Sequence, residues 1–146
     1  MKSFVIFGLL TLCVVLRASA CLGADANDLV GAWKAESIER GGELAPKEAV
    51  DLLQMTFTND HVAIRGNFQD DREVTSKYWI DLSKNPYELT LKKNPGDLPV
   101  LAIFRFIEGK LQICARPDGK AGKRPTRFST TKEDPDLVLV TFAKVK

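Results

Sequence analysis

The sequence predicts an all-β fold, an antiparallel up-and-down barrel of about eight strands that follows an N-terminal signal peptide. Apolar and polar residues alternate with a period of two along most of the chain, which is typical of strands with one buried face. Short stretches rich in Gly, Pro, Asn and Asp separate these runs. Short links favour antiparallel neighbours, and closure into a barrel removes the exposed edges of an open sheet.

The N-terminus has the three parts of a secretory signal peptide. Lys2 supplies a positive charge, residues 4–16 are almost entirely apolar, and Ala18 to Ala20 form a small-residue cleavage site. A retained membrane anchor is the alternative, although the apolar run is shorter than the about 20 residues that span a bilayer. We expect residues 1–20 to be removed, with cleavage as late as residue 26 left open, and residues 27–146 to form one domain.

The charge balance gives no indication of a nucleic-acid partner. The chain has 21 basic and 19 acidic residues, but Lys2 and Arg17 leave with the signal peptide. The mature chain then carries equal numbers of both signs, so the basic isoelectric point belongs to the precursor alone. We therefore expect an exported protein, periplasmic or secreted, that does not bind nucleic acid.

Two cysteines outside the signal peptide leave three alternatives open. Cys21 follows Ala18-Ser19-Ala20, which resembles a lipobox, so Cys21 is a candidate for lipidation and for a membrane anchor. A disulfide between Cys21 and Cys114 is the second alternative, since export implies an oxidising compartment. Cleavage after Ala26 would remove both possibilities and leave a freely exported protein. The alternation places Cys114 on the outer face of its strand, within reach of a chain terminus, which is consistent with a bond to Cys21.

Eight runs are expected to form strands, and one short stretch is expected to be helical. The strands are predicted over residues 31–38, 53–58, 61–65, 74–82, 87–92, 100–107, 110–115 and 137–145. Residues 46–50 begin with a proline, which suits the first position of a helix, and we expect one helical turn that acts as a small lid or plug.

Two hairpins can be aligned from their apolar residues. A two-residue turn at 59–60 pairs Phe57 with Val62 and Met55 with Ile64, so both strands present their apolar residues to one face. A tight turn formed by residues 108 and 109 likewise pairs two sets of apolar residues, which we assign to the interior. These sets are Phe106 with Leu111 and Phe104 with Ile113.

The first strand opens on a glycine two residues before a tryptophan. Gly31 allows the backbone to bend or to approach another segment closely. Trp33 shares one face with Ala35 and Ser37 and brings a large apolar surface that can close one end of a small barrel.

Five aromatic residues and one isoleucine are the candidate lining of the barrel interior. They are Trp33, Phe57, Tyr78, Ile80, Phe104 and Phe106. An eight-stranded barrel is just wide enough either to be filled by side chains or to hold one small ligand, and both alternatives stay open. Trp79 falls on the opposite face, as a partner contact or as a residue covered by a loop.

The search for catalytic and metal-binding residues predicts none, and no cofactor or enzymatic activity is expected. His61 is the only histidine and adjoins a hairpin turn. The acidic cluster of Asp70, Asp71 and Glu73 is expected to be a solvated loop rather than a cation site.

A basic loop between the last two strands is a second candidate site. Arg116, Arg124 and Arg127 could meet an anionic ligand or partner at the barrel mouth, whereas the alternative is a solvated, glycine-rich loop.

The segment Leu29-Val30-Gly31-Ala32-Trp33 resembles the Gly-x-Trp opening of lipocalins. Beyond it, the chain resembles a bacterial lipocalin-like domain family of unknown function that is abundant in planctomycetes, over residues 29–37, 78–86, 111–114 and 123–128. This resemblance implies an eight-stranded calycin-type barrel, export, and binding of a small hydrophobic molecule.

Lipocalins often place an arginine of the last strand against the motif tryptophan. Residues 137–146 contain no arginine, only Lys144 and Lys146, so Arg124 or Arg127 would have to supply the stack, or the feature is missing.

Two functions follow as hypotheses. The first is an exported binding protein with a small apolar or amphipathic ligand in the barrel. The second is a protein-binding module, such as an inhibitor of secreted proteases, with a packed interior and recognition by the N-terminal segment or the loops.

Overall fold

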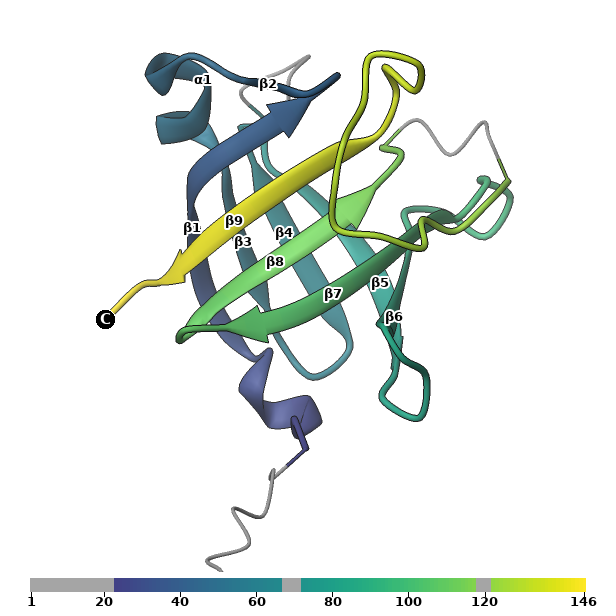
Figure 1. Cartoon of the computed structure of the whole chain (residues 1–146). Helices are drawn as coiled ribbons and strands as arrows, with labels where there is room; N and C mark the ends of the chain where they lie inside the picture. Colours follow the sequence, from purple (N-terminus) through teal and green to yellow (C-terminus); the bar gives the residue numbers. More distant parts are fainter. Residues whose placement is uncertain (1–22, 67–71, 118–121) are drawn as a thin grey trace, which may run out of the picture.

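Eight antiparallel strands close into a barrel in the computed structural model, which describes residues 23–66, 72–117 and 122–146 (Figure 1). The barrel strands are β1 (Gly31–Arg40), β3 (Gln54–Phe57), β4 (His61–Arg65), β5 (Val74–Asp81), β6 (Tyr87–Lys92), β7 (Val100–Ile107), β8 (Lys110–Ala115) and β9 (Val138–Lys144). Each strand pairs with its neighbour in chain order, and β9 pairs with β1 to close the sheet. The predicted all-β, up-and-down barrel is confirmed.

Three short elements accompany the barrel. They are the 3₁₀ helix η1 (Ala26–Asp28), the strand β2 (Glu43–Leu44) and the helix α1 (Lys47–Leu52). The segment carrying η1 lies below the barrel in Figure 1, and α1 and β2 lie at the opposite end. The signal peptide expected over residues 1–20, the candidate Cys21 and the acidic pair Asp70-Asp71 lie outside the described residues.

Both predicted hairpins have the expected register. Phe57 pairs with Val62 and Met55 with Ile64 across β3 and β4. Between β7 and β8, Phe104 pairs with Ile113 and Phe106 with Leu111. The β7–β8 turn has positive φ at both central residues, 52° and 75°, as a two-residue turn matched to strand twist requires.

The interior face of β1 differs from the predicted alternation. Trp33 and Ala35 point into the core as expected, but the register shifts between Ala35 and Ser37 in the pairing with β9. This β-bulge adds one residue to β1, so Ile38 rather than Ser37 is buried in the main core.

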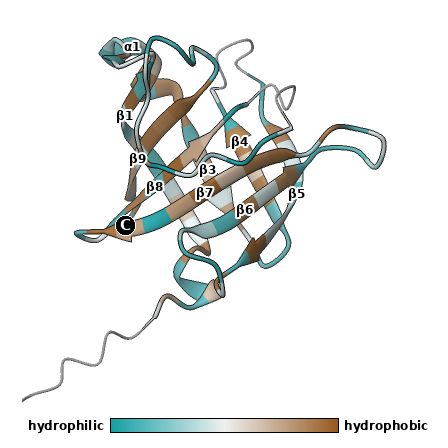
Figure 2. Ribbon diagram, turned by 45° about the vertical axis from the view of Figure 1, so that its right-hand side comes forward, coloured by the Kyte–Doolittle hydropathy of each residue, from teal (hydrophilic) through white to brown (hydrophobic). Residues whose placement is uncertain are grey.

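The helical stretch forms part of the cover over one end of the barrel. Helix α1 extends two residues beyond the expected turn, and Val50 on it is buried against the barrel core. Its other residues are largely exposed, and Figure 2 shows this helix as mainly hydrophilic while hydrophobic residues follow the barrel strands. The expected lid is therefore held by one apolar side chain and the adjoining Leu53.

Candidate functional site

Trp33 closes the end of the barrel where the N-terminal segment crosses. Its side chain is 3% exposed, and its indole Nε1 donates a hydrogen bond to the Leu29 carbonyl oxygen at 2.9 Å. Leu29 itself is fully buried in the main core. A buried indole N–H needs such a partner, so this bond holds the N-terminal segment against the end of the barrel that Trp33 closes.

The last strand supplies a cation to the motif tryptophan. Lys144 of β9 places its Nζ 5.3 Å from the centre of the Trp33 ring, within the range of a cation–π contact. Gly31 has a φ of 131°, and a Cβ added there would lie 3.1 Å from Lys144 Cε. Of the alternatives raised by the sequence, an arginine of the loop is not the one found: Arg124 bonds to β6 and β7, and a lysine of the last strand lies over Trp33.

The candidate interior aromatics pack against one another. Ring centres of Trp33 and Phe106 are 6.1 Å apart, those of Phe106 and Phe104 are 5.9 Å apart, and Tyr87 follows at 5.5 Å from Phe104. Phe57 and Phe104 are each 1% exposed. Such contacts stabilise a core beyond the area they bury. These residues form a packed aromatic layer at the Trp33 end of the barrel.

Tyr78 links this core to the β3–β4 turn. Its ring meets Phe57 edge to face, with centres 5.1 Å apart, and its hydroxyl donates a hydrogen bond to the Thr58 carbonyl oxygen. Burial raises the pKa of the Tyr78 phenol, and the Asp60 carboxylate raises it further. Tyr78 therefore stays a neutral hydrogen-bond donor.

A groove of about 240 Å³ lies beside Tyr78, between the N-terminal segment and the end of β5. Its lining comes from the N-terminal segment, the β3–β4 turn and the end of β5, and consists of Ala26, Asn27, Val30, Asn59, Tyr78, Trp79 and Ile80. Of the predicted interior residues, only Tyr78 and Ile80 reach it. Trp79 points outward as expected and is 53% exposed. The alternation of residues predicted that Trp79 points outward, but it could not predict that residues 26–30 lie beside it.

The three arginines of the basic loop do not come together in one site. Arg116 pairs with Asp134 and donates from Nη1 to the Lys123 carbonyl oxygen at 3.1 Å, so it ties the two ends of the loop together. Arg127 is exposed and makes no ion pair or hydrogen bond with the described residues. The expected set at the barrel mouth is thus divided among different roles.

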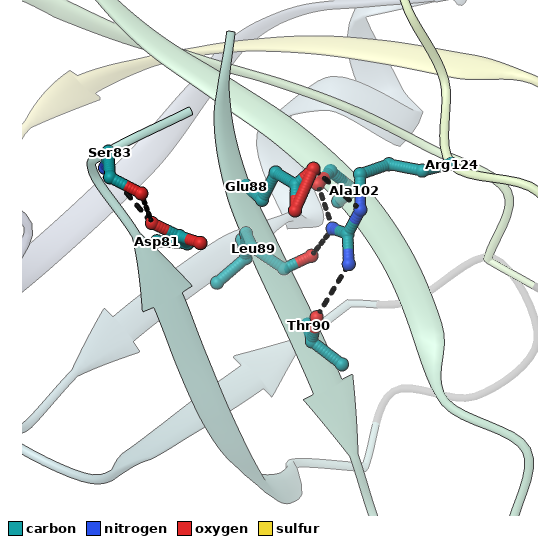
Figure 3. Close-up of polar contacts among 7 residues, drawn as sticks. All are labelled: Asp81, Ser83, Glu88, Leu89, Thr90, Ala102 and Arg124. Atoms are coloured by element: carbon teal, nitrogen blue, oxygen red, sulfur yellow. Dashed lines mark hydrogen bonds and ion pairs between the residues drawn. The ribbon is translucent and has the colours of Figure 1, made fainter. Parts of the chain in front are cut away.

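Arg124 lies against the outer wall of the barrel (Figure 3). Its Nη1 donates to the carbonyl oxygens of Leu89 at 2.8 Å and Ala102 at 2.6 Å, one on β6 and one on β7. Its Nη2 donates to Thr90 Oγ1 at 2.9 Å, and its Nε lies 3.5 Å from a carboxylate oxygen of Glu88. Because the guanidinium is shared among four partners, Arg124 fastens the loop to the wall.

Replacing Arg124 by lysine is expected to lower the free energy of unfolding by about 1–2 kcal/mol, since an ammonium cannot reproduce the planar set of donors. Chemical denaturation measures the change. Arg127→Lys, three residues along the same loop, is the control and is expected to change stability by less than about 0.5 kcal/mol. Equal effects of the two substitutions would contradict the fastening role.

Cys114 lies on the outer face of β8 but is covered. It is fully buried in a second cluster with Ile103 and Leu139, against which Phe128 and Leu137 pack from the loop. Within the described residues, the Cys114 thiol is free and the loop covers it. The alternative of a bond to Cys21 involves a residue outside this part of the chain. The alternation correctly predicts the outer face for Cys114, but a loop that folds back over this face has no local sequence signal.

Burial raises the pKa of the Cys114 thiol to about 11, although a backbone hydrogen bond from Ser129 acts in the opposite direction. The unfolded thiol titrates near 9.0. The stability contributed by the neutral thiol is therefore complete below about pH 9 and is lost as the pH rises towards about 11. We expect a loss of about 2 kcal/mol across this window.

Denaturation at a series of pH values, with Cys114→Ala as the comparison, measures this effect. The variant retains the titration of Tyr78, whose raised pKa acts in the same direction, so the difference between the curves isolates the thiol. Parallel curves for the two proteins would contradict the assignment.

The histidine forms a surface pair. His61 Nδ1 lies 2.8 Å from Asp60 Oδ1, and this contact lowers the pKa of the Asp60 carboxyl. Within residues 23–66, 72–117 and 122–146, no group of His, Cys, Asp and Glu side chains is arranged to hold a metal ion. None of the helices in this part of the chain has the length and hydropathy needed to cross a membrane.

Comparison with known proteins gives no relative for the chain. No family model matches it, and no match is found among the curated proteins or among the solved structures. The class that the fold itself defines is a closed, eight-stranded antiparallel β-barrel.

Proposed function

We propose that the chain is an exported, lipocalin-like binding protein that recognises a protein partner with its outer surface. The observation that carries this proposal is the packing of the candidate ligand-lining residues against one another. Trp33, Phe104 and Phe106 are in ring contact, and the first two are almost fully buried. A carrier of the kind that the family resemblance implies needs open space where these side chains meet.

The outer surface supplies the second argument. Trp79 exposes half of its side chain beside the groove, and tryptophan is among the residues that contribute most to protein–protein binding. Recognition by the N-terminal segment was one form of the protein-binding hypothesis, and η1 forms one wall of this groove.

Export rests on the signal peptide indicated by residues 1–20. We propose free release into the periplasm or the medium, with lipid attachment at Cys21 as the alternative. Mass spectrometry of the mature N-terminus separates the two, because a lipidated chain begins at Cys21 and carries the added mass of acyl groups.

Affinity capture with the purified protein, from the periplasm or medium of the producing cells, tests the proposed function. A partner retained in stoichiometric amount is expected, and fluorescent fatty-acid and retinoid probes are expected not to bind. Saturable binding of one probe molecule per chain, with no partner retained, would favour the carrier function and overturn the proposal.

A further inference from the structure

Strand β5 extends beyond the strand that precedes it. The β4–β5 ladder ends with the pair His61 and Lys77, after which the Tyr78 N–H donates to the Asp60 carbonyl oxygen at 3.2 Å. The chain then turns back, because the Thr58 N–H donates to the His61 carbonyl oxygen at 2.8 Å. The last residues of β5 therefore have a neighbour on the β6 side alone.

Ile80 lies on the part of β5 that continues past the β4–β5 ladder. Backbone groups of successive strand residues point to opposite sides, so Ile80 directs its N–H and C=O to the same side as Tyr78. The β3–β4 turn lies on that side, and its Asn59 lines the groove together with Ile80, Ala26, Asn27 and Val30. No hydrogen bond of these two Ile80 groups to a described residue is present. An extended chain laid in the groove could pair with both.

The size of the groove limits what can occupy it. Its volume of about 240 Å³ is smaller than the roughly 300–1,000 Å³ of a typical small-molecule pocket. It exceeds the roughly 150 Å³ of an apolar cavity that holds one benzene molecule. Ala26, Val30 and Ile80 give the lining an apolar part, and Trp79 adds a half-exposed aromatic wall. One large apolar side chain fits this space.

Carboxylates near the groove favour a positively charged partner. The Asp60 carboxylate acts directly on the lining residue Tyr78. Asp25, Asp28 and Asp81 adjoin lining residues in the sequence, as does Lys77, and the cations Lys84 and Arg124 act on Asp81. The pKa of the Asp60 carboxyl is lowered by its hydrogen bond to His61, and that of Asp81 by its hydrogen bonds to Ser83, so both stay ionised at neutral pH. A basic peptide complements this rim.

We propose that the groove binds an extended, basic peptide segment of a partner protein by strand addition to β5 at Ile80. One large apolar side chain of the segment enters the groove beside Trp79, and flanking lysine or arginine residues face the aspartates. Strand addition draws affinity from main-chain hydrogen bonds and specificity from pockets for alternate side chains. This inference rests on the proposed function and names the site and chemistry of the partner.

Binding of fluorescein-labelled pentapeptides to the purified protein, followed by anisotropy, tests the inference. The probe Lys-Thr-Phe-Thr-Lys is expected to bind with a dissociation constant below about 1 mM. Its counterpart Glu-Thr-Phe-Thr-Glu and a form methylated on its backbone nitrogens are each expected to bind at least about tenfold more weakly. Absence of binding by the basic probe at about 1 mM, or equal binding of the three peptides, would overturn the inference.

Two substitutions locate the binding. Trp79→Ala is expected to weaken the basic probe at least about tenfold without unfolding the protein, because the side chain is half-exposed. Leu44→Ala, at the α1 end of the barrel, removes an even more exposed apolar side chain and is expected to leave binding unchanged. Equal affinities of the two variants would overturn the inference.

The same variants separate this inference from the proposed function. If a stoichiometric partner is captured equally well by Trp79→Ala and by the unchanged protein, the groove is not the binding site, whereas the protein-binding function stands. If no partner is captured and a lipid probe binds instead, the proposed protein-binding function is contradicted, and the inference with it.

Discussion

Replacing Gly66 by alanine is expected to lower the free energy of unfolding by about 3–5 kcal/mol. Gly66 follows β4 with a φ of 75°, a conformation that costs energy in any residue with a Cβ. A Cβ built there would lie 2.0 Å from the Leu52 carbonyl oxygen and 2.4 Å from its carbonyl carbon. Both atoms belong to the backbone at the end of α1, so the clash can be relieved only by moving that helix or the end of β4.

Gly109→Ala is the matched control for this substitution. Gly109 has the same φ of 75°, but a Cβ added there meets nothing within 4 Å. It is expected to cost about 1 kcal/mol, the contribution of the backbone conformation alone. Thermal or denaturant unfolding of the two variants measures the difference. Similar losses in both would show that α1 does not pack on Gly66 as described.

Replacing Trp33 by alanine is expected to cost about 3–5 kcal/mol. The substitution removes a 3% exposed indole together with its bond to Leu29, its contact with Phe106 and the surface on which Lys144 rests. The cavity left behind would lie at the closed end of the barrel. Denaturant unfolding followed by circular dichroism measures the change.

Trp79→Ala is the control for Trp33→Ala. It removes the same side chain from an outward-facing position and is expected to change stability by less than about 0.5 kcal/mol. If Trp33→Ala instead kept full stability and abolished binding of a lipid probe, Trp33 would be a pocket wall rather than part of a packed floor.

Local patterns predicted the strands and their hairpin partners well. The expected ranges 87–92, 100–107 and 110–115 agree with β6, β7 and β8. In a hairpin, turn length and side-chain alternation together fix the register, and both can be found within about fifteen residues of sequence. This is why Phe57 with Val62 and Phe106 with Leu111 could be paired in advance.

Features that depend on contacts between distant segments could not be predicted in the same way. The bulge after Ala35 becomes evident only when β1 is paired with β9, which lies about a hundred residues further on. The Lys144 contact with Trp33 depends on the same pairing, and the burial of Cys114 depends on a loop that folds back over β8. The short strand β2 had too few residues to show a period.

The candidate site was predicted in part. Alternation placed Tyr78 and Ile80 on one face and Trp79 on the other, and all three line the groove. The groove forms because β5 continues past the end of its ladder with β4 and because the N-terminal segment crosses below the barrel. Neither feature is indicated by a local sequence pattern. Arg124 was not predicted to have a structural role. The composition of its loop suggested a solvated segment, but Arg124 has four partners on the barrel wall.

Titration with xenon, followed by methyl NMR, tests most directly whether the barrel interior is filled by side chains. Xenon enters dry apolar cavities whatever ligand the protein has evolved to bind. Methyl signals of Leu111 and Val140, in the barrel core, are expected to show no saturable shift. Saturable shifts at Leu111 and Val140 would reveal an open interior and contradict the packed-barrel account.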